Sequence, residues 1–506
     1  MDKNYYITTP IYYVNDKPHI GHAYTSIACD VLARFKRLDG YSVKFLTGTD
    51  EHGQKVEKAA KSQNKSPLEY ANFISKDFKS LTKTLNLSND DFIRTTEKRH
   101  ILAAQSLWSK LYENKHIYLD KYAGWYALRD EAFYSEKEII NGKAPSGADV
   151  SWVEEESYFF DLSKWQDKLL EFYDKNPNFI LPKSRMNEVK SFVKGGLRDL
   201  SVSRTSFEWG VKVPNNDKHI MYVWLDALTN YLSAIGYPDT LENEYVNFWP
   251  ADIHMVGKDI LRFHAVYWPA FLMAAELPLP KRIFAHGWWT NEGKKISKSE
   301  GNVIDPLEII SSYGLDQIRY FLLREVPFGS DGDFSKTALL ARINGDLSND
   351  LGNLCQRVIS MIYKNCNGFI PRKCEKLNDR DIIFYNKSND LYEKVKNEID
   401  KQSFHEAIKL IWAFISDANK YVDEQAPWKL RKTDERRMND VLWILADTIR
   451  KIAIIVQPFM PDSSTKILDQ LSIDISERDF SYLDSKHAIK TNKINSPSPI
   501  FPRIEE

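Results

Sequence analysis

Cysteine is scarce in this chain, whose 506 residues include four: Cys29, Cys355, Cys366 and Cys374. None belongs to a C-x-x-C pair, which excludes a disulfide framework and a cysteine-based zinc knuckle. The stretch "MDKNYYITTPIYYV" lacks the continuous apolar core of a signal peptide. No apolar run reaches the roughly 18 residues that a transmembrane helix needs. These absences predict a cytoplasmic protein without a membrane partner.

A strong charge of either sign is also missing, because 69 basic and 70 acidic residues give a formal net charge of -1. A polyanionic partner would therefore have to bind a local basic patch rather than the whole surface. The length predicts two to four domains with ample core.

Hydrophobic periodicity predicts an alternation of strands and helices at the start of the chain. "NYYITTPIYYV" is β-branched and aromatic and favours a strand. From His19 the apolar residues recur at three- and four-residue steps, which predicts a helix ending near Gly40. A second strand is expected at Ser42–Leu46, followed by a turn with Gly48 and Gly53. Helical patterns at 58–83 and 99–115 complete a pattern typical of an α/β fold with a doubly wound, Rossmann-like parallel sheet.

The composition and the hydrophobic pattern change several times along the rest of the chain, and these changes predict the domain boundaries. Short aromatic strands and a loose Gly/Pro/Ser stretch indicate an inserted connective domain, and helices dominate the C-terminal third. The predicted parts are the first half of the catalytic domain at 1–115, the insertion at 116–218, the second half at 219–275, a signature-loop and stem-contact region at 276–335, an all-α bundle at 336–484 and a polar, frayed tail at 485–506.

The stretch "PHIGH" places Pro18, His19, Gly21 and His22 where the first strand gives way to the helix. The backbone N–H groups of a helix start attract phosphate, and imidazoles can donate to phosphate oxygens. Gly21 would let a flat base approach the backbone. Two ordinary surface histidines at a helix start are an equally good interpretation of this stretch alone.

A second polar stretch, "GKKISKSEGNVIDP", carries Lys294, Lys295, Ser297 and Lys298. A loop rich in lysine and glycine suits a triphosphate whose charge is stabilised as a bond breaks. In isolation, a solvated basic loop is the commoner case. Together with "PHIGH", the stretch predicts one nucleotide held at the carboxyl ends of the strands.

"HIGH" and "KISKS" resemble the two signatures of the class I aminoacyl-tRNA synthetases. "PIYYVNDKPHIGHAY", "FLTGTDEHG", "MYVWLDALTNY", "VGKDILRFH", "FAHGWW" and "GNVIDP" are similar to the methionyl-tRNA synthetase family over almost the whole chain. This resemblance implies that ATP and L-methionine form an adenylate, from which methionine passes to initiator and elongator tRNA(Met). It also implies Mg²⁺ as the ion on the phosphates.

The resemblance assigns roles to particular residues. The catalytic set is His19, His22, Lys295 and Lys298. The methionine pocket is Ile11, Tyr13, Asp50, Trp224, Ala227, Leu228, Tyr231 and His286, with Asp50 on the α-ammonium and His286 or Tyr231 at the sulfur. The ATP site is His19, Gly21, His22, Gly257, Asp259, Lys295, Ser297 and Lys298. Leu228 departs from the proline of some relatives. From the residues alone, a helix face packed into the core is the commoner interpretation of Trp224 and Tyr231.

In the helical third, the resemblance implies that Asn353, Arg357 and Trp428 read the anticodon, with the aromatic ring stacking an unstacked base. A helical-bundle face with a buried Trp is the alternative. Many relatives hold zinc through cysteines in the insertion, but no cysteine lies between Cys29 and Cys355. We therefore expect a connective insertion without zinc, and no other metal site. Lacking a further C-terminal domain, the chain is expected to be a monomer.

Three other functions compete with this one. A class I synthetase for Leu, Ile or Val would need a large editing insertion, and one for Cys would need zinc-binding thiols. A small-molecule nucleotidyltransferase can share the His-x-x-His start but needs no helical region with an Asn/Arg face and an exposed Trp. A non-catalytic RNA-binding module would have lost the phosphate-binding residues His19, His22, Lys295 and Lys298, which are present.

Overall fold

The computed structural model of the chain describes residues 3–15, 17–130, 132–134, 136–296, 302–373 and 377–505. The chain divides into two compact units. The sheet unit comprises Asn4–Pro18 and Val43–His286, and the helical unit comprises Met1–Lys3, His19–Ser42 and Gly287–Glu506. None of the described helices combines the length and apolarity needed to cross a lipid bilayer.

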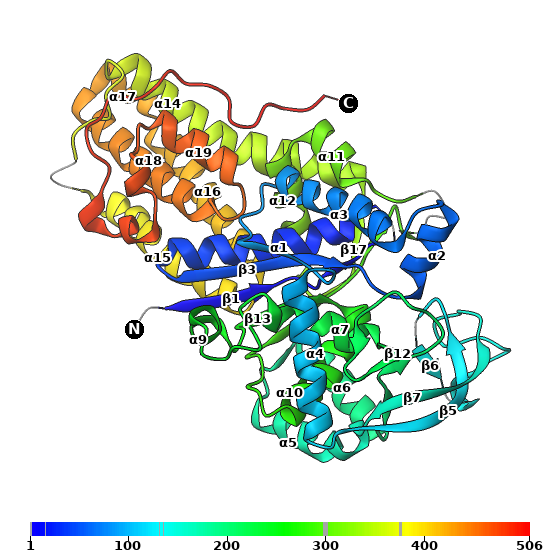
Figure 1. The fold of residues 1–506 in the computed structure, drawn as a ribbon. Helices are drawn as coiled ribbons and strands as arrows, with labels where there is room; N and C mark the ends of the chain where they lie inside the picture. The colour runs from blue at the N-terminus through cyan, green and yellow to red at the C-terminus, as the bar shows by residue number, and fades with distance from the viewer. Residues whose placement is uncertain are drawn as a thin grey trace. The chain divides into compact units, whose positions relative to one another are not determined.

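The sheet unit is built on a parallel sheet in the order β2-β3-β1-β13-β14-β8, with β4 also paired to β3 (Figure 1). Parallel pairing joins β1 to β13, β13 to β14, β14 to β8, and β3 to both β2 and β4. This agrees with the predicted parallel sheet. The strands are β1 (Asn4–Thr8), β2 (Tyr12–Tyr13), β3 (Ser42–Asp50), β4 (Asp91–Arg94), β8 (Ile180–Leu181), β13 (Ile253–Gly257) and β14 (Ile283–His286).

The helices of the sheet unit pack around two apolar clusters, a large one that includes Tyr6, Trp108, Trp268 and Phe271 and a smaller one, formed with the first two of these helices, that includes Val56 and Phe78. The helices are α2 (Gln54–Ser62), α3 (Pro67–Thr84), α4 (Lys98–Glu113), α5 (Gln166–Lys175), α6 (Lys183–Lys194), α7 (Val223–Leu228), α8 (Asn230–Ser233), α9 (Asn243–Phe248) and α10 (Trp268–Ala274). Short 3-10 turns are η1 (Glu136–Glu138), η2 (Leu162–Trp165) and η3 (Lys258–Ile260), and η4 (Phe263–Tyr267) is a π-helix.

The segment predicted as an insertion, 116–218, contains the expected aromatic strands in an antiparallel sheet of order β6-β5-β7-β9. A further small sheet has the order β10-β12-β11. Strand β8 of the same segment, however, pairs with β14 in the main sheet, so only part of the segment stands apart from it. The strands are β5 (Ile117–Ala127), β6 (Ala132–Tyr134), β7 (Ser151–Phe160), β9 (Leu200–Ser201), β10 (Ser203–Arg204), β11 (Lys212–Val213) and β12 (Asn216–Met221).

The helical unit contains the first long helix of the chain, a small sheet of order β16-β15-β17 and the C-terminal bundle, which runs from yellow to red in Figure 1. Its elements are α1 (Ile20–Leu38), β15 (Trp289–Asn291), β16 (Lys294–Lys295), α11 (Pro306–Tyr313), α12 (Leu315–Arg324), β17 (Gly332–Phe334), α13 (Lys336–Arg342), the π-helix η6 (Ile343–Gly352), α14 (Asn353–Asn365), α15 (Asp379–Asp400), α16 (Phe404–Gln425), α17 (Pro427–Thr433), α18 (Glu435–Val456), α19 (Pro461–Gln470), η7 (Ile475–Glu477), η8 (Phe480–Leu483) and η9 (Ser485–His487).

Helix α1 is fixed to the rest of the helical unit by buried charges. The guanidinium of Arg319, which is fully buried, donates to Asp30 at 2.7 Å and to the carbonyl of Phe459 at 2.9 Å. Near the C-terminus of α1, Lys36 donates to Asp400 at 2.6 Å. The helix that begins with the "HIGH" stretch is therefore held by both α12 and the bundle.

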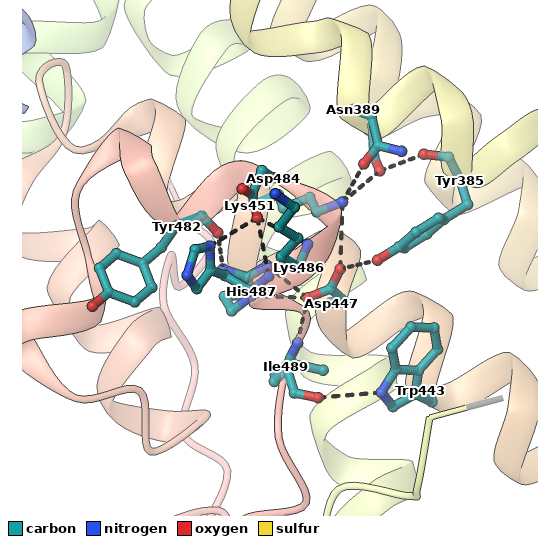
Figure 2. A network of polar contacts seen from close by, with 12 residues as sticks. Tyr385, Asn389, Trp443, Asp447, Lys451, Tyr482, Asp484, Lys486, His487 and Ile489 are labelled. Carbon is teal, nitrogen blue, oxygen red and sulfur yellow. Dashed lines mark hydrogen bonds and ion pairs between the residues drawn. The ribbon is translucent and has the colours of Figure 1, made fainter. Parts of the chain in front are cut away.

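The C-terminal segment is not frayed, which corrects the prediction for residues from 485 onward. Ile489 donates its backbone N–H to Asp447 at 2.8 Å and accepts from the indole of Trp443 at 3.3 Å (Figure 2). Further along, Asn344 and Ile504 exchange two hydrogen bonds. The segment is ordered because apolar side chains such as Phe501, 4% exposed, are buried in spite of its polar composition.

Two local expectations are also corrected. The helical pattern at 58–83 is interrupted between α2 and α3, because Ser66 caps a new helix whose first residue is Pro67 and whose Glu69 completes a capping box. Gly48 lies within β3 rather than in a turn. A Cβ there would come within 2.0 Å of the carbonyl oxygen of Ile93, so the close approach of β4 requires glycine.

Candidate functional site

The two histidines of "HIGH" form the cap of helix α1. Nδ1 of His19, the N-cap residue, accepts from the backbone N–H of Gly21 at 3.1 Å, and Nδ1 of His22 accepts from the backbone N–H of His19 at 3.0 Å. Pro18 immediately precedes this cap and lies outside the helix. Because both Nδ1 atoms accept, each neutral imidazole carries its proton on Nε2, the atom that can donate to a phosphate.

Burial, and secondly the charge of the neighbouring His19, hold the pKa of His22 well below its ordinary value of 6.5. His22 is therefore neutral near pH 7. Gly21 has a specific role in this geometry, since a Cβ there would lie 2.9 Å from Cε1 of His19. Any side chain at Gly21 would displace the capping imidazole.

The second signature begins in β16, which pairs antiparallel with β15 in the same unit. Ser297 and Lys298 lie outside the described residues, and Lys295 is placed through its backbone. Beyond the signature, the carbonyl of Asn302 accepts from Asn291 at 2.9 Å, and the carbonyl of Ile304 accepts from the backbone N–H of Ile20 at 3.2 Å. Ile20 directly follows His19, so the chain leaving the signature is tied to the start of the "HIGH" helix.

In the sheet unit, Tyr231, one of the predicted methionine-pocket residues, is hydrogen-bonded to His264. Nδ1 of His264 lies 2.9 Å from the carbonyl of Ile260 and therefore carries a proton, so its Nε2 accepts from the Tyr231 hydroxyl at 2.7 Å. Burial lowers the pKa of His264 from 6.5 to about 4. Trp224 stacks on Phe263 with ring centroids 3.8 Å apart and meets His264 edge to face.

Five other predicted pocket residues lie in the same unit. Tyr13 on β2 is the register partner of Asp50, the last residue of β3, and Asp50 is 8% exposed. Ile11 is partly buried against the core that also contains Leu228. Ala227 and Leu228 are buried in α7, one turn after Trp224. The apolar residues are thus both core and candidate pocket wall, so the two alternatives posed by the sequence are compatible.

The predicted adenosine residues lie at the carboxyl end of β13. The Asp259 carboxylate folds back over Gly257, where a Cβ would come within 2.4 Å of its Oδ1. His286 ends the neighbouring strand β14 and is the register partner of Gly257. This edge of a parallel sheet is where α/β folds bind nucleotides.

The predicted anticodon residues meet on the bundle. The guanidinium of Arg357 lies over the ring of Trp428, 5.3 Å from its centroid, and pairs with Asp423 at 2.6 Å. Trp428 is 42% exposed, which suits a stacking surface and not a buried bundle position. Asn353 starts α14 one turn before Arg357, immediately after the π-helix η6.

Comparisons with known proteins agree on one family. Residues 5–150 and 137–359 match the family model described as tRNA synthetases class I (M), and residues 370–506 match the anticodon binding domain of methionyl tRNA ligase. The chain is 57% identical to the methionine–tRNA ligase of Rickettsia felis, with 100% of this chain and 99% of the relative covered. The enzyme of Brucella suis is 52% identical, with 100% and 98% covered.

A solved structure of the Mycobacterium tuberculosis methionyl-tRNA synthetase in complex with methionyl-adenylate is 48% identical, with a TM-score of 0.96 over 99% of this chain and 100% of that one. The chain belongs to the methionyl-tRNA synthetase family. The predicted class I fold with a helical anticodon-binding domain is thereby confirmed. The domain boundaries and residue roles given above stay predictions.

Two residues of this synthetase's candidate pocket were missed by the sequence analysis. His264 and Phe263 contact Tyr231 and Trp224, whereas His286 was the histidine expected at the sulfur. Both lie in the stretch "VGKDILRFH", of which Gly257 and Asp259 alone were selected. A π-helix, which often marks a functional site, begins at Phe263. Its backbone pattern has no simple sequence signature.

Proposed function

We propose that this chain is a methionine–tRNA ligase, which attaches L-methionine to initiator and elongator tRNA(Met) through methionyl-adenylate and releases AMP and pyrophosphate. The observation that carries the proposal is that every contributing stretch is present in one chain: an imidazole-capped helix start, a lysine-rich signature followed by a segment hydrogen-bonded to that helix start, an aromatic cluster and a buried carboxylate in the sheet unit, and an Arg–Trp platform on a helical bundle. The product supports both initiation and elongation of translation.

In the first step, the methionine carboxylate attacks the α-phosphorus of Mg²⁺–ATP, and pyrophosphate leaves in line. No protein nucleophile or general base is needed, so catalysis consists of orientation and charge stabilisation. Nε2–H of His19 and of His22 donates to the phosphates, and Lys295 and Lys298 bring positive charge. Gly21, Gly257, Asp259 and Ser297 complete the ATP site. The Mg²⁺ ion arrives with ATP and neutralises the leaving pyrophosphate.

The methionine site supplies complementary chemistry to both ends of the amino acid. Asp50 pairs with the α-ammonium, and the aromatic rings of Tyr13, Trp224 and Tyr231 surround the flexible thioether. Because Tyr231 donates its proton to His264, its oxygen presents lone pairs to the pocket. Ile11, Ala227, Leu228 and His286 complete the wall.

In the second step, a terminal ribose hydroxyl of the tRNA attacks the mixed anhydride. Asn353, Arg357 and Trp428 bind the anticodon, and Arg357 is already oriented by Asp423 and by the Trp428 ring.

We further propose that the enzyme acts as a cytoplasmic monomer and that its insertion needs no zinc. In that insertion, Asp130 accepts from Tyr134 at 2.8 Å and also from Ser146, which links the segments on either side of the connecting loop.

The decisive test is ATP–pyrophosphate exchange with each of the twenty amino acids. We expect exchange with methionine alone; exchange dependent on leucine, isoleucine, valine or cysteine would point to another class I synthetase. Exchange with a substrate that is not an amino acid would indicate a nucleotidyltransferase. Absence of exchange with every substrate would indicate a non-catalytic RNA-binding module. Lys298→Ala is expected to reduce exchange by several orders of magnitude while methionine binding is retained. If exchange and methionine binding were lost equally, the role of Lys298 would be structural and not catalytic.

A further inference from the structure

A buried carboxylate in the sheet unit holds two histidines. Oδ2 of Asp226 lies 2.7 Å from Nδ1 of His52, and Oδ1 lies 2.7 Å from Nε2 of His100. Asp226 and His100 are fully buried and His52 is 4% exposed. Neither the adenylate chemistry nor the residue roles proposed above make use of these side chains.

The protonation of this network follows from its geometry. Burial alone would raise the pKa of Asp226, but the charge of His52 and the hydrogen bonds from both imidazoles outweigh it and hold this pKa at about 2. An ionised carboxylate only accepts, so Nδ1 of His52 and Nε2 of His100 are both donors. The other ring nitrogen of His100 lies 3.1 Å from Oγ of Ser233. The four side chains form one continuous chain of hydrogen bonds.

The positions of these residues relate them to the methionine pocket. His52 follows Asp50 by two residues, Asp226 follows Trp224 by two, and Ser233 follows Tyr231 by two. Three of the segments that supply a polar or aromatic pocket residue, those of Asp50, Trp224 and Tyr231, therefore each supply one member of the network as well. His100, from α4, joins the second and third of them.

We propose that Asp226 is a positioning residue for methionine: by holding His52 and, through His100, Ser233, it sets the separation of Asp50, Trp224 and Tyr231 around the amino acid. This inference rests on the proposed function and adds the device that orients its amino-acid site. Charge-assisted hydrogen bonds are directional and short, so they fix separations that apolar packing would leave adjustable.

The position of His52 offers a test that separates hydrogen bonding from bulk. Asparagine places an amide N–H close to where Nδ1 of His52 lies, so His52→Asn keeps the donor to Asp226, whereas His52→Leu removes it at similar volume. In ATP–pyrophosphate exchange, we expect His52→Leu and Asp226→Asn to raise KM for methionine about tenfold or more, since each breaks a buried charge-assisted bond. His52→Asn should stay near the wild-type value, and KM for ATP should change little in all three.

Asp161 provides a matched control in the same unit. This buried carboxylate also faces a histidine, with His116 Nδ1 at 3.1 Å, and it accepts from the indole of Trp165 at 3.3 Å. None of its partners is assigned to the site. Asp161→Asn is therefore expected to lower the melting temperature as Asp226→Asn does, while KM for methionine remains that of the wild type.

The inference is overturned if Asp226→Asn or His52→Leu leaves KM for methionine unchanged, or if Asp161→Asn raises it equally. It is also overturned if KM for ATP rises in parallel, because the network would then support the whole unit. Should Asp226→Asn not fold, the two His52 variants still decide the question. A wild-type enzyme without methionine-dependent exchange would refute the proposed function itself, whereas normal wild-type exchange with unaffected variants refutes only the role of Asp226.

Discussion

Each of the two compact units contains a fully buried aspartate, and the two are held by different kinds of donor. Asp226 in the sheet unit is held by two imidazoles. Asp447 in the helical unit faces Arg450 at 2.8 Å. It also faces Lys451 at 3.4 Å and accepts from the hydroxyl of Tyr385 at 2.6 Å (Figure 2). Guanidinium and ammonium groups bring a positive charge to their partner, whereas an imidazole binds a carboxylate through one directional ring N–H. Asp447 is thus held by counter-charges from its own helix, and Asp226 by ring N–H donors from two distant segments.

The largest expected effect is at Asp447. Asp447→Ala would leave Arg450 and Lys451 buried beside a cavity without their counter-charge, which costs about 3–5 kcal/mol of unfolding free energy. Urea denaturation of the variant measures this loss. Asp447→Asn, which keeps the volume and one acceptor, is expected to lose less. A near-wild-type stability for Asp447→Ala would show that the network in Figure 2 is solvated and not a structural centre.

The next effect concerns the pH dependence of the pocket. The pKa of His264 is about 4 in the folded chain and 6.5 in the reference state, so the unfolded chain binds the proton more tightly. The stability that neutral His264 contributes is therefore complete above pH 6.5 and is lost as the pH falls toward 4. The loss amounts to about 3 kcal/mol over that interval.

His264→Gln isolates this contribution, because its amide oxygen can accept from Tyr231 and does not titrate. We expect the unfolding free energy of the wild type to fall relative to that of the variant as the pH is lowered from 6.5 to 4.5. A difference that stays constant across this interval would contradict the assignment of Nε2 of His264 as a buried acceptor.

The parts of this molecule that could be predicted from the sequence are those coded locally. Helix α1 was expected from His19 to near Gly40 and is found at Ile20–Leu38, because its apolar period is strong and uninterrupted. The break before Pro67 also has a local signal, the capping box of Ser66 and Glu69, but hydrophobic periodicity alone does not register it. The "HIGH" histidines were expected as phosphate donors, but their second role as a helix cap required the backbone geometry.

The parts that could not be predicted depend on contacts between distant residues. Tyr231 is separated from His264 by 33 residues and Asp226 from His52 by 174, and no local pattern indicates which histidine faces which partner. The order of the tail has the same origin: Phe501 is an isolated apolar residue in a polar sequence, and it is buried next to Gly352 of η6, while Ile504 is hydrogen-bonded to Asn344 of the same element.

A smaller effect, confined to one step of the reaction, is expected on the bundle surface. Trp428→Ala removes a stacking platform worth about 1–3 kcal/mol per base, so aminoacylation of tRNA should fall about 10- to 100-fold. Adenylate formation, followed by pyrophosphate exchange, should stay near normal. Tyr363→Ala is the control, since Tyr363 is 43% exposed on the same helix as Arg357 but on another face. Loss of exchange in Trp428→Ala would mean that the bundle is not a separate reader of tRNA.

The smallest effect on stability is expected for an ion pair that is exposed to solvent. Arg380 pairs with Glu424 at 2.6 Å on the same bundle, and both side chains are more than a third exposed. Exposed pairs contribute about 0.2–1 kcal/mol and are screened by salt, so Arg380→Ala should change the urea midpoint little and less still in high salt. If this variant proved as unstable as Asp447→Ala, burial would not be what distinguishes the two ion pairs.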